Sequence, residues 1–263
     1  MPDADTAAAP RIDLNCDLGE SFGAWTMGAD ADVLPHVTSA NIACGFHAGD
    51  PATMRRTVAL AHAAGVAIGA HASLPDLVGF GRREMRVSPD DAYAMVLYQL
   101  GALAGFAQAA CVRLRHLKPH GALYNMAARD AALADAIAAA VGDFDPALRL
   151  VGLAGSELIR AGERAGLGVL REAFVDRRYA ADGSLAARGT PGAVIDDADA
   201  AIAQALALAR GDSVTACDGT PLRIAADTLC VHGDRDDAGR FAQRLRAALD
   251  GAGIEVRAPE DGA

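Results

Sequence analysis

The strongest constraint on this chain is the repeated alternation of short apolar segments with longer helical patterns. Seven segments have the composition of buried strands, and most lead through a turn into an alanine-rich helical segment. Such alternation is typical of a parallel sheet whose strands are joined by helical crossovers. The pattern fits both an open, doubly wound sheet and a closed barrel. The expected strands lie at residues 11–17, 39–43, 66–70, 112–118, 148–153, 168–174 and 228–232.

Length and composition favour a single globular domain. The chain has 263 residues, 52% of them hydrophobic, which is long for an average domain but ordinary for an α/β barrel. The strand and helix pattern occupies residues 11–257, so we expect one domain there. Residues 1–10 are rich in alanine, aspartate and proline and are expected to form a disordered tail, and residues 258–263 a second tail.

Charge and cysteine content restrict the partners and the compartment. The formal net charge of -10 argues against a nucleic-acid partner and against an anionic membrane surface. The five cysteines are odd in number and form no C-x-x-C pair, which favours reduced thiols. The sequence has neither a recognisable signal peptide nor a long uncharged apolar run. We therefore expect a cytoplasmic protein that does not enter a membrane.

The first expected strand has an unusual polar face. Alternate side chains of a strand share a face, so Asp13, Asn15 and Asp17 should point the same way. Such a face can line a functional site. It can also belong to an edge strand whose polar side lies in water, and Ile12 and Leu14 fit that interpretation. This strand alone does not decide between the two.

The stretch at residues 39–51 is a short apolar run that ends in a glycine-bracketed turn and leads into a helix. Turns from a strand into a helix are where α/β proteins place their chemistry. Asn41 shares the inward parity of the strand, and His47 follows its end. Asp50 directly before Pro51 is typical of a helix N-cap followed by the first helical residue, so we expect Asp50 to cap rather than to catalyse.

Polar side chains also follow the ends of the other expected strands. In a parallel sheet or barrel the carboxyl ends of all strands lie on one rim, so these side chains should converge there. Any one of them, taken alone, is better explained as a structural residue, and the hypothesis of a site rests on the whole set. The set consists of Asp17, His47, His71, Lys118, His120, Glu172, His232 and Asp234.

Common cofactor motifs are missing from the sequence. It has no phosphate-binding loop G-x-x-x-x-G-K-[ST], no dinucleotide turn G-x-G-x-x-G and no H-E-x-x-H zinc motif. His116 and His120 form an H-x-x-x-H string, but on a strand their rings would stand roughly 13 Å apart, too far to share one ion. Asp17, His47 and His71 would offer a plausible set of oxygen and nitrogen donors for a divalent ion. The alternative, which we favour, is that these groups hydrogen-bond one another and the substrate.

Five long motifs resemble the LamB/YcsF family, also known as the A subunit of the ATP-dependent 5-oxoprolinase. They occur in order, and the resemblance covers residues 11–256. Motifs of this length are specific, so the chain is identified as a member of this family. The motifs are DLNCDLGESFG at residues 13–23, SANIACGFHAGDP at 39–51, KPHGALYN at 118–125, EAFVDRRY at 172–179 and CVHGD at 230–234.

The resemblance implies a distorted parallel (β/α) barrel of about seven strands, of the kind found in glycoside hydrolases and polysaccharide deacetylases. It also implies cleavage of the lactam of 5-oxo-L-proline to L-glutamate, coupled to ATP hydrolysis, with subunits B and C as partners. ATP would bind to this chain or through a partner subunit, and a need for a divalent metal stays open. Two expected loops over the site depart from the family pattern, at Ala72 and Leu74 and at Ala186 and Ala187.

Opening a lactam needs a base for water, an acid for the leaving nitrogen, and donors or positive charge at the developing oxyanion. We expect Asp17 or Glu172 to act as the base and Lys118 to supply the positive charge. The acid and the donors are expected among the histidines His47, His71 and His120. The expected substrate-binding residues are Asp13, Asn15, Asn41, Arg188, His232 and Asp234.

Two other functions stay open. The chain could be a metal-dependent deacetylase or amidohydrolase that works alone and without ATP. It could also be a non-catalytic subunit whose rim holds a carbohydrate or lactam ligand. Stoichiometric metal with ATP-independent product release would favour the first, and tight 5-oxoproline binding with full activity after rim mutations would favour the second.

Overall fold

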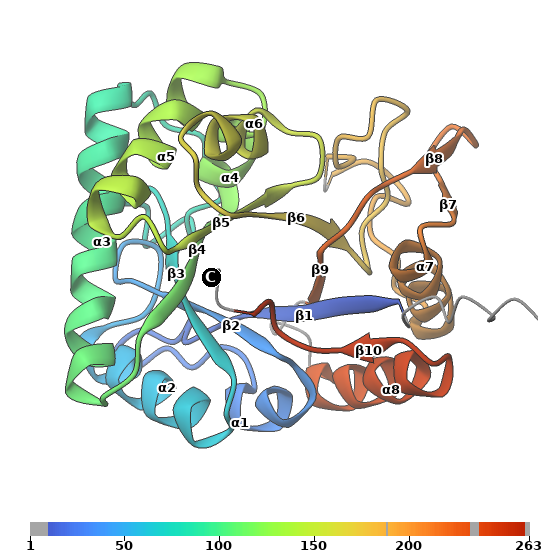
Figure 1. The fold of residues 1–263 in the computed structure, drawn as a ribbon, viewed down its shortest axis with the longest axis horizontal. Coiled ribbons are helices and arrows are strands. Elements are labelled where there is room, and N and C mark those ends of the chain that lie inside the picture. Colours follow the sequence, from blue (N-terminus) through green and yellow to red (C-terminus); the bar gives the residue numbers. More distant parts are fainter. Residues whose placement is uncertain (1–9, 188, 232–236, 261–263) are drawn as a thin grey trace, which may run out of the picture.

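The computed structural model describes residues 10–187, 189–231 and 237–260. Its main sheet is parallel and closed, because β9 pairs with β6 on one side and with β1 on the other (Figure 1). The choice between an open sheet and a barrel is thus decided in favour of a seven-stranded barrel. Its strands, in hydrogen-bonded order, are β1 (Arg11–Leu18), β2 (Ser39–Ala43), β3 (Ala67–Ala72), β4 (Leu114–Pro119), β5 (Arg149–Leu153), β6 (Val169–Phe174) and β9 (Thr228–Val231).

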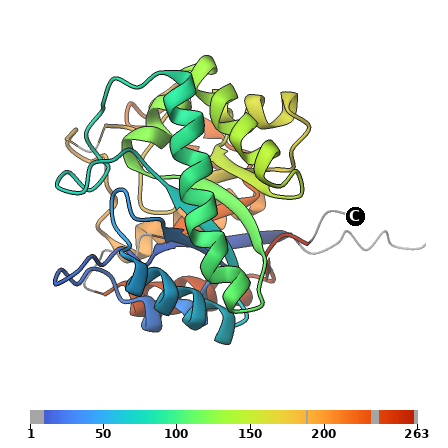
Figure 2. The same ribbon diagram turned by 90° about the vertical axis from the view of Figure 1, so that its left-hand side faces the viewer.

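Helices cover the outside of the barrel, and α3 crosses the face that is turned to the viewer in Figure 2. The Asp50 side chain accepts hydrogen bonds from the backbone amides of Ala52 and Thr53, which confirms Asp50 as the N-cap of α2. The helices are α1 (Asp30–Val33), the 3-10 helix η1 (Leu34–His36), α2 (Pro51–Ala63), α3 (Pro89–Ala109), α4 (Gly121–Ala127), α5 (Ala131–Phe144), α6 (Glu157–Arg164), α7 (Ala198–Arg210) and α8 (Ala238–Gly251). No helix among the described residues is long and apolar enough to cross a membrane.

Three small strands lie outside the seven-stranded ring. β7 (Ser213–Thr215) and β8 (Pro221–Arg223) form an antiparallel hairpin after α7. β10 (Glu255–Val256) pairs with the first residues of β1, at the end of the barrel where β1 begins. The loops that follow β1 and β3 lie together at the opposite end in Figure 2, so the carboxyl ends of the strands share one rim.

Polar side chains fill part of the barrel interior. β1 lies between β2 and β9, and Asp13 and Asn15 are each 2% exposed, so the interpretation of β1 as an edge strand is wrong. Asp13 lies deepest and is satisfied by three neighbouring hydroxyl groups. These belong to Thr38, Ser39 and Thr228, at 2.6, 2.8 and 2.5 Å. The polar face of β1 therefore points into the barrel, and Asp17 on that face reaches the rim.

Candidate active site

Two groups of side chains meet at the carboxyl end of the barrel, and nearly all of them are buried. They touch each other, but their composition differs. The first group, the lysine side, consists of Asp17, Lys118 and Glu172. The second group, the histidine side, consists of Glu20, His47, His71 and His120.

Lys118 on β4 joins the carboxylates of the lysine side across the barrel. Its Nζ lies 2.7 Å from Glu172 Oε1 and 2.9 Å from Asp17 Oδ1. It also lies 3.2 Å from both Asn15 Oδ1 and Cys230 Sγ. Burial alone would lower the pKa of Lys118, but the neighbouring carboxylates raise it well above its ordinary value. Lys118 therefore stays a cation at neutral pH.

Asp17 connects the two sides. Its Oδ1 accepts hydrogen bonds from Lys118 and from the Asn41 amide at 2.8 Å, and its Oδ2 lies 3.1 Å from His71 Nε2. Burial would raise the pKa of Asp17, but the contacts with His71 and Lys118 lower it well below its ordinary value. Asp17 is therefore a carboxylate at neutral pH and can accept a proton.

A layer of amides below the rim holds these groups in place. Asn41 donates to Asn15 Oδ1 at 2.8 Å, and His116 Nε2 lies 2.7 Å from Asn41 Oδ1, which accepts its hydrogen. Burial lowers the pKa of His116 to about 3, so its ring is neutral. Any side chain at Gly69 would collide with this ring, which explains a glycine in the middle of β3. His116 is thus hydrogen-bonded to Asn41 below the rim and does not share a site with His120, as the strand spacing predicted.

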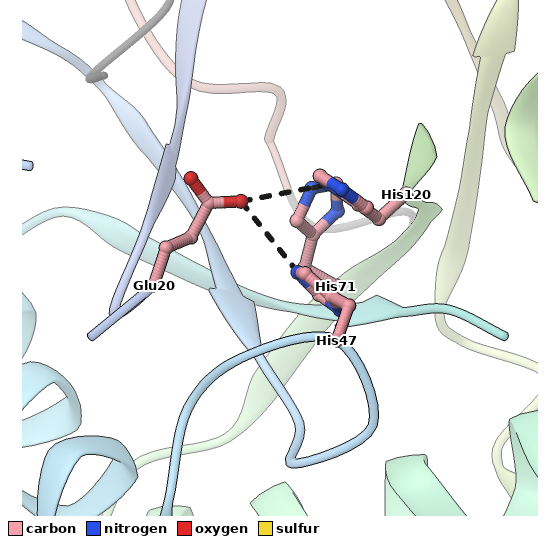
Figure 3. A group of neighbouring side chains, drawn as sticks. All are labelled: Glu20, His47, His71 and His120. Carbon is pink, nitrogen blue, oxygen red and sulfur yellow. Dashed lines mark hydrogen bonds and ion pairs between the residues drawn. The ribbon is translucent and has the colours of Figure 1, made fainter. Parts of the chain in front are cut away.

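Glu20 reaches the histidine side because the chain turns after β1. Gly19 has a φ of +69°, which favours glycine, and its amide donates to Asp30 Oδ2 at 3.0 Å. The turn brings Glu20 Oε1 to 3.5 Å from both His47 Nε2 and His120 Nδ1. Figure 3 shows this carboxylate facing the imidazole rings.

The three imidazole rings of the histidine side pack against one another. The His47 ring stacks on the His120 ring with centroids 3.9 Å apart, and His71 stands edge-on to both. His71 Nε2 lies 2.9 Å from His120 Nδ1. Together with Glu20, each residue offers one ligand atom, and these four atoms lie within 4.8 Å of one another. They are the described residues best placed to hold a metal ion.

Backbone carbonyls determine which ring nitrogens carry hydrogen. His71 Nδ1 lies 2.9 Å from the Lys118 carbonyl oxygen, and His120 Nε2 lies 2.9 Å from the Phe80 carbonyl oxygen. Because a carbonyl oxygen can only accept, both of these nitrogens must donate. The other two nitrogens, His71 Nε2 and His120 Nδ1, face each other. Burial and the neighbouring histidines hold the pKa of His47 and of His120 well below the ordinary value.

The loop between β3 and α3 covers the histidine side with its backbone. Phe80, which supplies the carbonyl for His120, has a φ of +54°, and Gly81 follows with +64°. The Gly81 carbonyl accepts from the Ala122 amide at 2.8 Å, and a Cβ at Gly81 would collide with Ser73. The loop is therefore joined to the start of α4 at a point where no side chain fits.

A cavity of about 710 Å³ opens next to both sides. Asp17, Glu20, His71, Lys118 and His120 all contribute to its wall. Besides Asp182 and Glu84, which is paired with an arginine, the remaining wall contains three cations. They are Arg82, Arg129 and Arg177.

The model of the LamB/YcsF family matches residues 12–262 of this chain. This chain belongs to the LamB/YcsF family. A relative from Tolumonas auensis, named as the A subunit of 5-oxoprolinase, is 58% identical over 94% of this chain and 99% of its own length. The protein of the same name from Bacillus subtilis is 56% identical over 94% of this chain and 96% of its own length. The family expected from the motifs is thus confirmed.

A solved structure of the same fold supports the barrel. The Lactam Utilization Protein from Thermus thermophilus is 50% identical to this chain and superposes with a TM-score of 0.90. The match covers 95% of this chain and 100% of that protein. The parallel barrel implied by the LamB/YcsF motifs is therefore confirmed.

The structure brings together most of the residues expected from the sequence. All six expected catalytic residues lie in the two sides of the site. Asn15 and Asn41 lie one layer below, whereas Asp13 lies deeper and does not line the cavity. The remaining three expected binding residues lie outside the described part of the chain. They are Arg188, His232 and Asp234.

The set considered for a metal is changed by the structure. Asp17, His47 and His71 are the metal ligands considered from the sequence. In the structure, one Asp17 oxygen contacts Lys118. The donor atoms that lie close together belong to Glu20, His47, His71 and His120. Strand parity missed Glu20 because this residue lies beyond the strand, after the turn at Gly19. The one available signal was its place inside the first family motif, at residues 13–23.

The four positions that depart from the LamB/YcsF pattern have different surroundings. Ala72 and Leu74 are fully buried, and the Ala72 carbonyl accepts from the His120 amide at 2.8 Å. Ala186 and Ala187 instead line the cavity. Only the second pair can therefore touch a molecule bound there.

Proposed function

We propose that this chain is the ring-opening subunit of a 5-oxoprolinase that converts 5-oxo-L-proline and ATP to L-glutamate, ADP and phosphate. One observation carries the proposal: an ionised Asp17 and a cationic Lys118 lie together on the wall of a cavity with room for a small anion. The names of the relatives, which refer to a 5-oxoprolinase and to lactam utilization, support the same substrate class.

A lactam is an unactivated amide, and this explains the need for ATP. Transfer of a phosphoryl group to the ring oxygen makes the ring carbon electrophilic. Water then adds to that carbon, the carbon–nitrogen bond breaks, and the nitrogen takes a proton. An acyl phosphate remains, and a second water hydrolyses it to the carboxylate and phosphate. The sequence has no phosphate-binding loop, so we assign the ring opening to this chain and the nucleotide to a partner subunit.

The residues of the site suit separate steps of ring opening. Asp17 is the base for water, because its lowered pKa keeps it ionised at neutral pH. Glu172 lies on the far side of Lys118 and is the second candidate for this role. Lys118 stabilises the negative charge of the phosphoryl group on the ring oxygen, because it stays a cation at neutral pH. Asp17, which lines the cavity, can then return the proton that it has taken from water to the leaving nitrogen.

The decisive assay measures glutamate formed from 5-oxoproline and ATP, first with this chain alone and then with subunits B and C added. We expect glutamate only from the mixture, with one ADP formed for each glutamate. Absence of glutamate under both conditions would contradict the proposal.

The histidine side favours one second candidate, an amidohydrolase that uses a metal ion and no ATP. Three imidazoles and a carboxylate around one point are the donor types of hydrolytic metal sites. The same assay separates the two candidates. Amide cleavage by this chain alone, supplied with a divalent metal and without ATP, would support the second candidate.

A further inference from the structure

We propose that Glu20, His47, His71 and His120 bind one divalent ion of the first transition series, with Zn²⁺ as the reference ion. Three imidazole nitrogens and one carboxylate oxygen form a donor set that such ions prefer over Mg²⁺ or Ca²⁺. The proposal concerns the ion alone and holds for either candidate reaction.

The distances between the donor atoms fit one shared ion. With bonds of about 2.0–2.1 Å, a tetrahedral zinc site has ligand atoms about 3.3 Å apart. The separations here are 2.9 Å for His71 Nε2 to His120 Nδ1 and 3.5 Å for Glu20 Oε1 to the nearer nitrogens of His47 and His120. No donor atom of the group is more than 4.8 Å from another. Small side-chain movements would therefore complete the site.

The hydrogen positions give a second, independent reason. His71 and His120 each donate one ring hydrogen to a backbone carbonyl, so the other nitrogen of each ring, which faces that of its neighbour, is the one that an ion would use. The two carbonyls that accept these hydrogens are outer partners of the kind that commonly orient metal-bound histidines.

Burial makes this arrangement costly without an ion. His47 is 1% exposed, and neither of its ring nitrogens has a hydrogen-bond partner among the residues that the structure describes. Buried polar atoms without partners are rare, and a bound ion is one way to satisfy them. Coordination through Nε2, which already faces Glu20, would satisfy that nitrogen of His47.

An ion bound here would be within reach of the cavity. Glu20, His71 and His120 line the cavity wall, whereas His47 lies behind them. The Asp17 carboxylate, 3.1 Å from His71 Nε2, joins the ion site to the lysine side. A molecule in the cavity can therefore touch both the ion and Lys118.

The test is metal content measured without any substrate. The full chain is stripped with a chelator, dialysed against Zn²⁺, passed through a desalting column and analysed by elemental mass spectrometry. We expect about one zinc per chain, and a rise in melting temperature of about 5–10 °C at a zinc concentration 100 times the dissociation constant. Co²⁺ in place of Zn²⁺ should give a visible absorption band from the same site.

Two variants and one matched control decide the assignment. His47→Ala with His120→Ala should remove the bound zinc, and Glu20→Gln, which keeps the shape of the side chain, should weaken zinc binding by at least about tenfold. His62→Ala is the control, because this exposed histidine on α2 tests adventitious binding, and it should still bind one zinc.

Circular dichroism confirms that each variant is folded. If the double variant does not fold, Glu20→Gln and the melting shift of the wild type carry the test. A folded wild-type chain that keeps less than about one tenth of a zinc would overturn the proposal. Unchanged zinc binding in Glu20→Gln, or equal loss in His62→Ala, would overturn it as well. Because no 5-oxoproline or ATP is present, a failed glutamate assay leaves this result unaffected.

Discussion

The lysine side and the histidine side are buried at the same end of the barrel, yet the lysine side consists of paired charges and the histidine side contains neutral rings. On the lysine side, the ammonium group of Lys118 contacts carboxylates from two other strands, so opposite charges meet directly. On the histidine side, burial keeps His47 and His120 neutral, and their nitrogens turn toward Glu20. The lysine side contains its own counter-charges, whereas the histidine side is arranged for a cation that comes from outside the chain.

This difference predicts how each side responds to its surroundings. Fixed ion pairs hold their protonation states over a wide pH range, so the lysine side should change little with pH. Neutral imidazoles can bind a metal ion. Near pH 6.5 the unfolded chain binds protons at His47 and His120 but the folded chain does not, so the stability contributed by the histidine side should depend on pH. Asp17 touches both sides and should transmit a change from one to the other.

The largest effect is expected from Lys118→Met. This variant leaves two neighbouring carboxylates buried without their cation, and removing one partner of a buried pair costs about 3–5 kcal/mol. Urea unfolding should show this loss of stability, and the assembled complex should form little glutamate. The control is Arg171→Ala, which removes a partly exposed pair with Asp227 and should cost at most about 1 kcal/mol. A loss below about 1 kcal/mol for Lys118→Met would contradict the description of the lysine side.

A large effect of pH on stability is expected from the histidine side. The folded-state pKa is lowered for His47, His116 and His120, so the unfolded chain binds protons near pH 6.5 while the folded chain does not. Stability is therefore complete above about pH 6.5 and falls below it. The slope is about 1.4 kcal/mol per pH unit for each such histidine.

Urea unfolding of metal-free protein at pH 7.5, 6.5 and 5.5 measures this slope. The double variant His47→Gln with His120→Gln should have a shallower slope, because two of the three histidines are gone. The lysine side should add nothing in this window, since the pKa of Lys118 is raised and that of Asp17 is lowered. A flat profile in the wild type would show that the imidazoles are not held neutral.

A smaller effect, on rate, is expected when the link between the two sides is removed. Asp17→Asn keeps the size of the side chain but removes its charge and its ability to take a proton. A proton-transfer group contributes about 10²–10⁴-fold to a rate, so glutamate formation by the complex should fall at least about tenfold. His120→Ala should also lower the rate, because the His120 ring contacts His71, which in turn contacts Asp17. Near-normal turnover with either folded variant would exclude that residue from the chemistry.

The smallest effect is expected outside both sides. Asp130 caps α5 by accepting from the amides of Ala132 and Leu133, and loss of an N-cap costs about 1 kcal/mol. Asp130→Ala should therefore lower the unfolding free energy by this amount and leave turnover and zinc content unchanged. A change in zinc content would mean that the site is sensitive to any loss of stability, and the variants above would need to be compared at equal stability.

Sequence periodicity predicted the barrel interior well, because strand geometry is regular. The alternation of Asp13, Asn15 and Asp17 gave their common direction, and the shared rim of a parallel sheet gave the convergence with Lys118 and Glu172. Lys118 and His120, two residues apart, both reach the site although they serve different sides. Because the strand backbone is regular, the sequence predicts that residues far apart in the chain meet at the same rim.

Periodicity failed where the backbone leaves the strand. Glu20 follows a left-handed glycine, so no parity rule gives its direction. Helix α4 begins directly after Pro119 and His120, where the glycine at 121 reads as the end of a strand and not as the start of a helix. The loop that covers the histidine side contacts it through the backbone carbonyls of Phe80 and Gly81. Every residue has such a carbonyl, so no sequence pattern predicts these contacts.

Closure of the barrel by β1 and β9 also limits the order in which parts of the protein can fold. Asn15 bonds to Thr228, 213 positions away, and Lys118 contacts Cys230, 112 positions away, so the barrel interior is complete only when residues far apart in the sequence have met. Contacts of such sequence separation form late in folding, because the long intervening chain must first be ordered. The barrel can therefore close around the lysine side only after β9 has left the ribosome, and a chain that ends before β9 has an unclosed sheet in its place.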